Sequence, residues 1–211
     1  MNIAVVGGGL AGLAVALGCE ESGHHVTLFE ASSELGGRMK TLRVDNHALD
    51  AGFHVLHTAY SAVKRWIDVD ALQTKAMDAC TMTLAPSTGR RRLLGDALRN
   101  PRYLLPTLKS VGIFDGLRFL RWRMQTSARE LERSMDAPSP TIAAGLMQRN
   151  FRPATQQVLR PLFAGITLDP TLSERFAFAD FAWGAMSHGK MVMPRNGIAA
   201  VPQQLASRLQ T

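Results

Sequence analysis

Apolar runs alternate with glycine-containing breaks over the first thirty residues of the chain. Residues 2–6 (NIAVV) form a short β-branched run that is typical of a buried strand. Residues 10–22 carry apolar side chains at helical spacing, and a second apolar run at 25–29 (HVTLF) follows Gly23. This order predicts a βαβ unit, whose two parallel strands are joined by a right-handed crossover.

The rest of the chain is predicted to form a hairpin followed by a mainly helical region. Residues 41–50 are expected to form the hairpin, with its turn at Asp45-Asn46. Residues 90–135 are expected to be largely helical. The other expected elements are helices at 60–72, 141–149, 153–163 and 201–209, a strand at 80–84, a mixed stretch at 172–184 and a return loop at 191–200.

The composition is that of a globular protein with a sizeable core, because 46% of the 211 residues are hydrophobic and 19% are charged. No run is long and apolar enough to predict a membrane-spanning helix. No basic segment precedes the apolar stretch 3–19, which we interpret as part of the fold rather than a signal peptide. Cys19 and Cys80 fit no metal-ligand spacing and are expected to be free thiols. We therefore expect a cytoplasmic chain without a metal site.

The break between the first strand and the first helix has the form G-x-G-x-x-G. It reads Gly7-Gly8-Gly9-Leu10-Ala11-Gly12. In such a turn Gly7 permits the tight bend, Gly9 lets a pyrophosphate approach the backbone, and Gly12 allows close packing of helix on strand. Glu30 ends the second strand, where a carboxylate would accept hydrogen bonds from ribose hydroxyls. The pattern predicts a dinucleotide site, against the alternative of a glycine-rich turn between core elements.

A second glycine-containing loop follows Glu30 at short distance. Gly36 and Gly37 bring the backbone close to a ligand, and Arg38 offers a forked cation for phosphate. NAD and FAD share the first motif, and this second loop favours FAD. The alternative for Arg38 is a solvated loop charge.

Three stretches, VVGGGLAGL, LFEASSELGGRM and LDAGFHVL, resemble the N-terminal region of the flavin-containing amine oxidase superfamily. This group includes monoamine oxidases, protoporphyrinogen oxidases and the carotenoid and squalene desaturases. The spacing of Asp50, Gly52 and His54 is most similar to the phytoene/squalene desaturase-like branch. Residues 157–209 also resemble that branch, more weakly than residues 1–60.

The resemblance implies FAD as the cofactor and a set of binding residues. FAD would be held by Gly7, Gly8, Gly9, Leu10, Ala11, Gly12, Glu30, Ala31, Gly37 and Arg38, with its flavin ring near Gly52, Phe53, His54 and Val55. No catalytic residue is assigned, because in this family the flavin itself accepts the hydride. On physical grounds His54 could equally be a satisfied buried histidine, and His57 is interpreted as structural.

The resemblance also implies the fold class and the domains. We expect an α/β chain with a Rossmann-like FAD-binding domain at 1–60, an inserted, mainly helical substrate domain at 61–188 and a return segment at 189–211. Family members are roughly twice as long. The chain is therefore expected to be truncated and to hold FAD weakly alone, with a second chain supplying the missing C-terminal half as one alternative.

The activity implied is hydride transfer from a hydrophobic substrate, such as a polyisoprenoid, to the flavin. Two alternatives remain open. One is a flavin-dependent isomerase without net redox change, and the other is a non-catalytic fragment or partner chain of a split enzyme. No sequence feature names the substrate or the electron acceptor.

The charge is unevenly distributed. The whole chain carries a net charge of +7, and residues 90–123 contain nine basic and two acidic residues, so this window accounts for the whole excess. Apolar side chains are interleaved with these cations. One interpretation is peripheral contact with an anionic membrane at its inner face, and the other is a solvated face of the substrate domain. Nucleic-acid binding is not expected.

Overall fold

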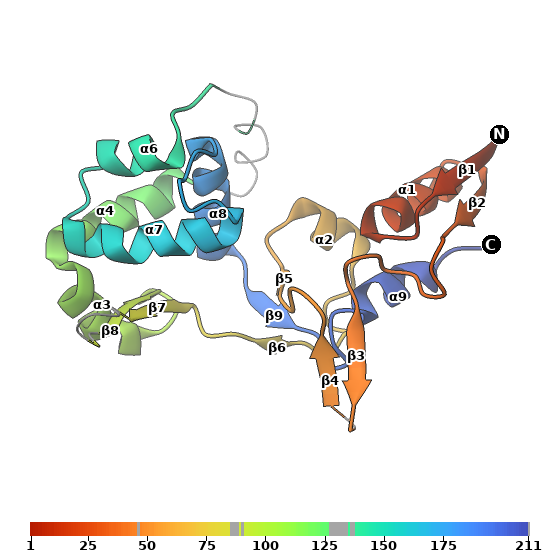
Figure 1. Cartoon of the computed structure of the whole chain (residues 1–211), viewed down its shortest axis with the longest axis horizontal. Helices are drawn as coiled ribbons and strands as arrows, with labels where there is room; N and C mark the ends of the chain where they lie inside the picture. The colour runs from red at the N-terminus through yellow and green to blue at the C-terminus, as the bar shows by residue number, and fades with distance from the viewer. Residues whose placement is uncertain (46, 85–88, 90, 127–134, 136–137, 211) are drawn as a thin grey trace. The chain divides into compact units, whose positions relative to one another are not determined.

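The computed structural model divides the chain into two compact units (Figure 1). It describes residues 1–45, 47–84, 89, 91–126, 135 and 138–210. The first unit comprises Met1–Met77 and Lys190–Thr211, and the second comprises Asp78–Gly189. The second unit is thus one continuous segment between the two segments of the first.

The first unit begins with the βαβ arrangement predicted from the sequence. Strand β1 (Asn2–Val6), helix α1 (Leu10–Glu21) and strand β2 (His25–Phe29) follow one another. The two strands are parallel and in register from the pair Asn2 and His25 to the pair Val6 and Phe29. This prediction is confirmed.

The prediction that β1 is a buried strand is wrong. Only Val5 of this strand is buried, whereas Val6 is 86% exposed. The reason is that β1 and β2 form a two-stranded sheet in the described part of the chain, and α1 packs on it through Ala16. On its other side α1 packs Leu13 and Leu17 against Leu205 of helix α9 (Ala200–Ala206).

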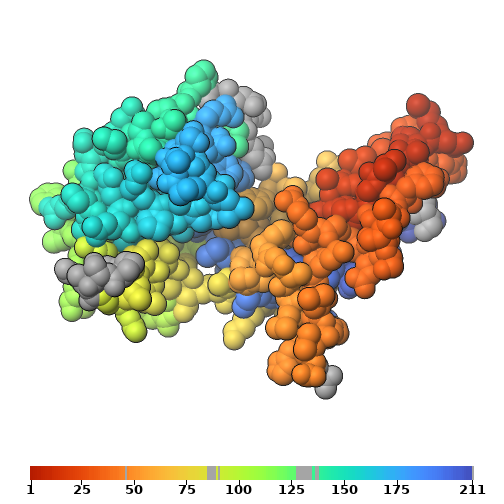
Figure 2. Space-filling view, in the orientation of Figure 1, coloured from red at the N-terminus to blue at the C-terminus, as the bar shows by residue number. Residues whose placement is uncertain are grey.

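The predicted hairpin is confirmed. Strands β3 (Thr41–Val44) and β4 (His47–Asp50) are antiparallel, and Asp45 has the left-handed backbone conformation of a turn. Asn46, the other predicted turn residue, lies outside the described residues. The side chains of this hairpin are largely exposed, and it extends from the first unit as a narrow arm (orange in Figures 1 and 2).

A three-stranded sheet completes the first unit, in the order β5 (Leu56–His57), β9 (Met191–Met193) and β6 (Lys75–Ala76). The predicted return loop therefore begins with a strand. Helix α2 (Ser61–Trp66) is shorter than the helix predicted over 60–72. The Asp68 carboxylate accepts the backbone N–H groups of residues 70 and 71, and a turn replaces the helix there.

The second unit starts with a hairpin of β7 (Cys80–Leu84) and β8 (Arg91–Gly95). The strand at 80–84 is confirmed, whereas the prediction of helix from residue 90 onward is wrong for β8, because cross-strand pairing with β7 holds this segment extended. Arg90 itself, and most of 127–137, lie outside the described residues.

Helices form the rest of the second unit. After a 3₁₀ turn (Pro101–Tyr103) come α3 (Leu104–Val111), α4 (Ile113–Gln125), α6 (Ile142–Gln148), α7 (Pro153–Thr167) and α8 (Phe176–His188). The helices predicted at 141–149 and 153–163 are confirmed. The stretch predicted as mixed is mostly α8. Trp122 stacks on Trp183 and Phe176 at the centre of the core that these helices share.

The compact units and the domains expected from the sequence differ at residues 61–77 and at Gly189. The segment 61–77 lies in the first unit, because β6 pairs with β9 and Val63 and Leu72 are buried in a cluster with Val192. Across the described residues, no helix has the length and apolar character needed to cross a membrane.

Candidate functional site

The glycine turn of the first unit requires glycine for two reasons, backbone conformation at Gly7 and close backbone contact at Gly12. Gly7 has φ +103°, a conformation that favours glycine, and its N–H donates to the carbonyl of Phe29 at 2.7 Å. A Cβ placed on Gly12 would overlap the carbonyl oxygen of Gly7. The first and third glycines of the motif are therefore required by the bend itself.

The two glycine loops lie backbone against backbone. The N–H of Gly36 donates to the carbonyl of Gly8 at 2.8 Å. A Cβ on Gly37 would lie 3.3 Å from the Cα of Gly9. Gly36 has φ +121°, and a Cβ there would lie 2.9 Å from Cγ of Pro202 in α9. The sequence motif did not predict this contact, since nothing local marks a proline 166 positions further on as a neighbour.

Glu30 joins the end of β2 to the glycine turn. Its Oε2 accepts the N–H of Gly8 at 2.6 Å, and its Oε1 accepts the N–H and the hydroxyl of Ser32 at 2.9 and 2.7 Å. The N–H and hydroxyl of Ser32, followed by the N–H of Gly8, lower the pKa of Glu30 from 4.5 to about 2. Glu30 is thus a carboxylate at neutral pH, half-buried beside the turn and able to accept hydrogen bonds. Ala31, next in the chain, is exposed.

The N-terminus of α1 opens onto this turn. Gly9 is its N-cap and provides no side-chain cap, and the first turn of the helix carries no acidic residue. Leu10 and Ala11 are exposed. A helix of twelve residues presents its first N–H groups and the positive end of its dipole to this region, which is the arrangement that binds anions.

Arg38 follows the second glycine loop and is exposed. It forms no ion pair with any residue that the structure describes. Its backbone lies next to Gly52, because a Cβ on Gly52 would lie 3.9 Å from the carbonyl oxygen of Arg38. The structure therefore brings Gly52 up to the second loop.

The residues after Gly52 are less tightly placed. Phe53 and His54 are exposed and Val55 is half-buried, and no hydrogen bond between described residues joins 52–55 to the first glycine turn. The exposure of His54 contradicts the alternative of a buried, satisfied histidine. His57 is buried, and its Nδ1 lies 3.4 Å from the N–H of Ala59, as expected of a structural residue.

Sequence reasoning missed a polar clamp around Asp50. Its Oδ1 accepts the hydroxyl of Thr41 at 2.6 Å and the N–H of Ile198 at 2.9 Å, while Thr41 Oγ1 accepts the N–H of Ala199 at 3.0 Å. The clamp holds the return segment against the hairpin immediately before Gly52. Gly197 (φ +85°) is the only local signal for it, and a Cβ there would overlap Thr41.

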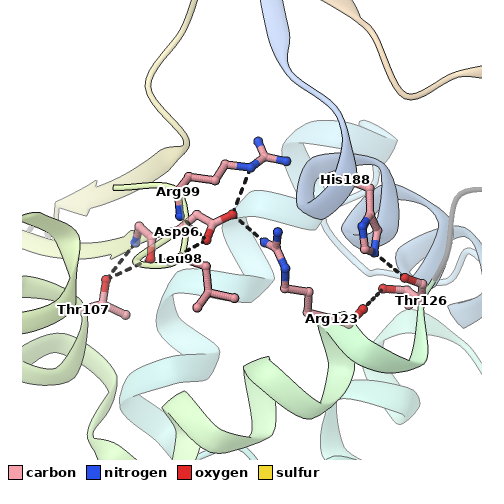
Figure 3. Close-up of polar contacts among 8 residues, drawn as sticks. Asp96, Leu98, Arg99, Thr107, Arg123, Thr126 and His188 are labelled. Carbon is pink, nitrogen blue, oxygen red and sulfur yellow. Dashed lines mark hydrogen bonds and ion pairs between the residues drawn. The ribbon is translucent and has the colours of Figure 1, made fainter. Parts of the chain in front are cut away.

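Polar contacts in the second unit join its own elements to one another (Figure 3). Asp96 binds Arg123 at 2.5 Å and Arg99 at 3.2 Å, and it accepts the N–H of Leu98 at 3.1 Å. A ring nitrogen of His188 lies 2.6 Å from the carbonyl of Thr126. These contacts join elements of the helical unit, whereas the glycine turn and the uncapped N-terminus of α1 lie in the first unit.

Comparisons with known proteins identify a family and a group of similar structures. The profile of the family described as flavin containing amine oxidoreductase matches residues 10–211. A 4,4'-diapophytoene desaturase (4,4'-diaponeurosporene-forming) from Staphylococcus aureus (strain Newman) is 46% identical over 52 residues, which are 25% of this chain and 10% of the desaturase.

Solved structures share the fold over almost the whole chain. Putrescine oxidase in complex with putrescine has a TM-score of 0.58 and 18% identity, over 100% of this chain and 50% of that one. A Pyrococcus furiosus protein has a TM-score of 0.64 and 17% identity, over 98% of this chain and 48% of that one. An oxidoreductase from Methanosarcina mazei has a TM-score of 0.57 and 16% identity, over 98% of this chain and 49% of that one. The chain thus spans about half the length of these structures.

The likeness inferred from the glycine loops is therefore confirmed. Since the family profile covers nearly every residue, the chain belongs to the flavin containing amine oxidoreductase family.

Proposed function

We propose that this chain binds FAD and provides the adenosine-diphosphate part of the site of a flavin-dependent oxidoreductase. The observation that carries the proposal is Glu30. It is an ionised carboxylate held by the N–H of Gly8, at the point where β2 ends beside the glycine turn. A ribose hydroxyl needs such an acceptor, and a pyrophosphate needs the uncapped N-terminus of α1 next to it.

The described residues fit the cofactor. The N–H groups of Leu10, Ala11 and Gly12 would hold the pyrophosphate, and the absence of side chains on Gly9 and Gly37 leaves the approach open. Glu30 would accept the ribose hydroxyls. Its negative charge would repel a phosphate on that ribose, which favours a nucleotide with free hydroxyls.

The second loop supports FAD rather than a nicotinamide nucleotide. Gly37 contacts Gly9, which places Arg38 directly after the loop that adjoins the turn, and Arg38 is exposed and available to a phosphate oxygen. Gly52 adjoins the Arg38 backbone, and the flavin ring is proposed to lie near the residues that follow it, Phe53, His54 and Val55. A bound flavin supplies the acceptor for a hydride.

A hydrophobic substrate, with a polyisoprenoid as the first candidate, is proposed from the relative. The Staphylococcus aureus enzyme is named for the conversion of 4,4'-diapophytoene, and the chain is 46% identical to it over 52 residues. Anaerobic incubation of the FAD-loaded protein with this polyene tests the proposal. Reduced flavin together with a desaturated product supports it. An isomerised product with flavin in its original redox state would contradict hydride transfer.

Binding of FAD is tested with ligands that contain or lack the adenosine-diphosphate part of the cofactor. Quenching of flavin fluorescence is expected with FAD and not with FMN, which lacks the adenosine, and ADP should compete with FAD. Equal binding of FMN, or no competition by ADP, would overturn the assignment of Glu30 to the ribose.

A matched pair of variants isolates Glu30. Glu30→Gln can still accept the N–H of Gly8 but loses the charge that strengthens a ribose hydrogen bond, and FAD affinity should fall by roughly ten- to a hundredfold. The control is Glu34→Gln, because Glu34 is an exposed carboxylate of the same loop whose backbone carbonyl makes its contact with Ser32. Equal losses in both variants would show a general charge effect and contradict the proposal.

A further inference from the structure

Helix α4 carries apolar side chains on the face that points away from its own core. Ile113, Leu117, Leu120 and Met124 follow the spacing i, i+4, i+7 and i+11, which places them in one stripe along the helix. Their exposed fractions are 67, 59, 41 and 77%. We refer to these four residues as the α4 stripe.

The opposite face of α4 is already used by the second unit. Phe119 and Trp122 are buried in the helical core, and the side chain of Asp115 is fully buried. A helix that is apolar on both faces normally has a partner on each. The α4 stripe is therefore surplus to the packing of the described second unit, and an apolar patch of this kind marks an interaction surface.

Cations border the stripe. Arg121, which follows Leu120 in α4, is exposed, and Lys109 of α3 is exposed as well. Neither side chain forms an ion pair with a described residue. The guanidinium of Arg152, also exposed, lies 5.5 Å from the ring centre of Phe114, which flanks the stripe. Arg121 and Arg152 therefore place positive charge beside exposed apolar side chains of α4, and Lys109 adds a cation on α3, the helix that packs on α4.

The two acidic residues of the basic window offset none of these charges. Asp96 is occupied by Arg99 and Arg123 (Figure 3). Asp115 pairs with Arg118 and accepts the N–H of Arg152 and the hydroxyl of Thr155. Burial raises the pKa of Asp115, but these hydrogen bonds outweigh it and the pKa falls below its usual range. Among the described residues, the side-chain charges of Lys109, Arg121 and Arg152 are therefore not neutralised by an ion pair with either carboxylate.

We propose that the α3–α4 surface binds the face of an anionic phospholipid bilayer, with the α4 stripe at the headgroup boundary. Apolar side chains that need an apolar medium, bordered by cations that need anions, match this interface on both counts. Leu105 of α3 is exposed as well and extends the apolar area. A protein partner would have to combine an apolar groove with an acidic rim, and is an outcome of the test.

Vesicle flotation of the purified chain tests the proposal. The chain should bind vesicles of phosphatidylcholine with about 30% phosphatidylserine and bind vesicles of phosphatidylcholine alone much more weakly. Leu117→Asp should lower partitioning into the vesicles by at least about tenfold. It removes apolar area that the bilayer would bury, and it adds a negative charge that the anionic lipids repel. Arg121→Glu should lower it by at least about fivefold and reduce its salt dependence.

Two controls match these changes in the first unit. Val15→Asp makes an equivalent change at an exposed apolar position of α1, and Arg43→Glu makes the same charge change on β3. Both should bind vesicles like the unchanged chain, and circular dichroism checks that all four variants keep their helices.

Three results would overturn the proposal. The first is no binding to anionic vesicles at low salt. The second is an equal loss of vesicle binding in Leu117→Asp and Val15→Asp, since the α4 stripe would then not be the binding surface. The third is a dimer that Leu117→Asp dissociates without any change in vesicle binding, which would assign the stripe to a second copy of the chain.

Discussion

The helical core of the second unit and the glycine loops of the first unit achieve order by opposite means. Around Trp122, order comes from side-chain volume, because fourteen buried residues form one cluster. Around Gly9 and Gly37, order comes from the lack of side chains, because two backbones touch. The first unit divides its burial among three small clusters. The region that bears the candidate site therefore depends on backbone geometry rather than on a large core.

The polar groups of the two regions differ in the same way. In the second unit Asp115 is buried, and Arg118, Thr155 and the N–H of Arg152 satisfy it from two helices. In the first unit Glu30 is only half-buried, and the helix beside it begins without a side-chain cap. A closed polar network stabilises a fold, whereas an open one leaves hydrogen-bonding capacity for a ligand.

The largest expected effect is in the core. Trp122→Ala removes a fully buried ring that stacks on Trp183 and Phe176, and should lower the free energy of unfolding of the second unit by about 3–5 kcal/mol. Urea unfolding followed by near-ultraviolet circular dichroism measures it. Trp66→Ala is the control, because Trp66 is half-buried and should cost clearly less. Equal costs would contradict the contrast between the two units.

Next comes the same substitution made in a helix of each unit. Gly12→Ala drives a methyl group into the carbonyl of Gly7 and should cost about 1–3 kcal/mol and abolish FAD binding. Gly165→Ala places the methyl in open space on α7 and should stabilise the second unit by about 0.5–1 kcal/mol. Thermal unfolding and flavin fluorescence report both. A Gly12→Ala protein with full FAD affinity would disprove the need for backbone contact in the turn.

A smaller effect is expected at the polar clamp. Thr41→Val removes the hydroxyl that donates to Asp50 and accepts the N–H of Ala199, and should lower the free energy of unfolding by about 1–2 kcal/mol. Thr81→Val on β7 is the control, since its hydroxyl makes no hydrogen bond among the described residues. Hydrogen exchange at Ile198 and Ala199 should quicken in the first variant alone. Unchanged exchange there would argue against the clamp.

The smallest effect is the response to acid. The pKa of Glu30 is about 2 in the folded chain against 4.5 normally, so its stabilising contribution is complete above about pH 4.5 and is lost as the pH falls towards 2. Asp169, whose pKa is lowered by hydrogen bonds from Thr171 and Ser173, behaves alike in the second unit. Glu30→Gln should flatten the acid transition of the first unit and Asp169→Asn that of the second. If either variant flattened the acid transitions of both units, the hydrogen-bond networks of Glu30 and Asp169 would not be independent.

Sequence patterns predicted the part of the site whose causes are local. The spacing of Gly7, Gly9 and Gly12, with a strand before and a helix after, follows from a single bend and was read correctly as βαβ. Glu30 could be placed because it ends the second strand. Each of these features depends on neighbours within about thirty residues.

Features that depend on strand pairing or on distant partners were missed. β8 was expected to be helical, because its pairing with β7 is invisible in its own composition. The exposure of Val6 follows from which elements cover β1, and not from its apolar character. Asp50 belongs to the pattern that supports the resemblance, but its partners Ile198 and Ala199 could be found only in the fold. The α4 stripe was noted only as apolar residues among cations.

The clamp between Thr41 and Ala199 joins positions 158 residues apart. A ribosome that has made the glycine loops has not yet made the segment that contacts them, because Pro202 of α9 follows Gly36 by 166 positions. Contacts of such long sequence separation form late and slowly. During synthesis the helical unit is therefore free to fold first. The glycine loops can reach their final packing only after the helical unit and α9 have both been made.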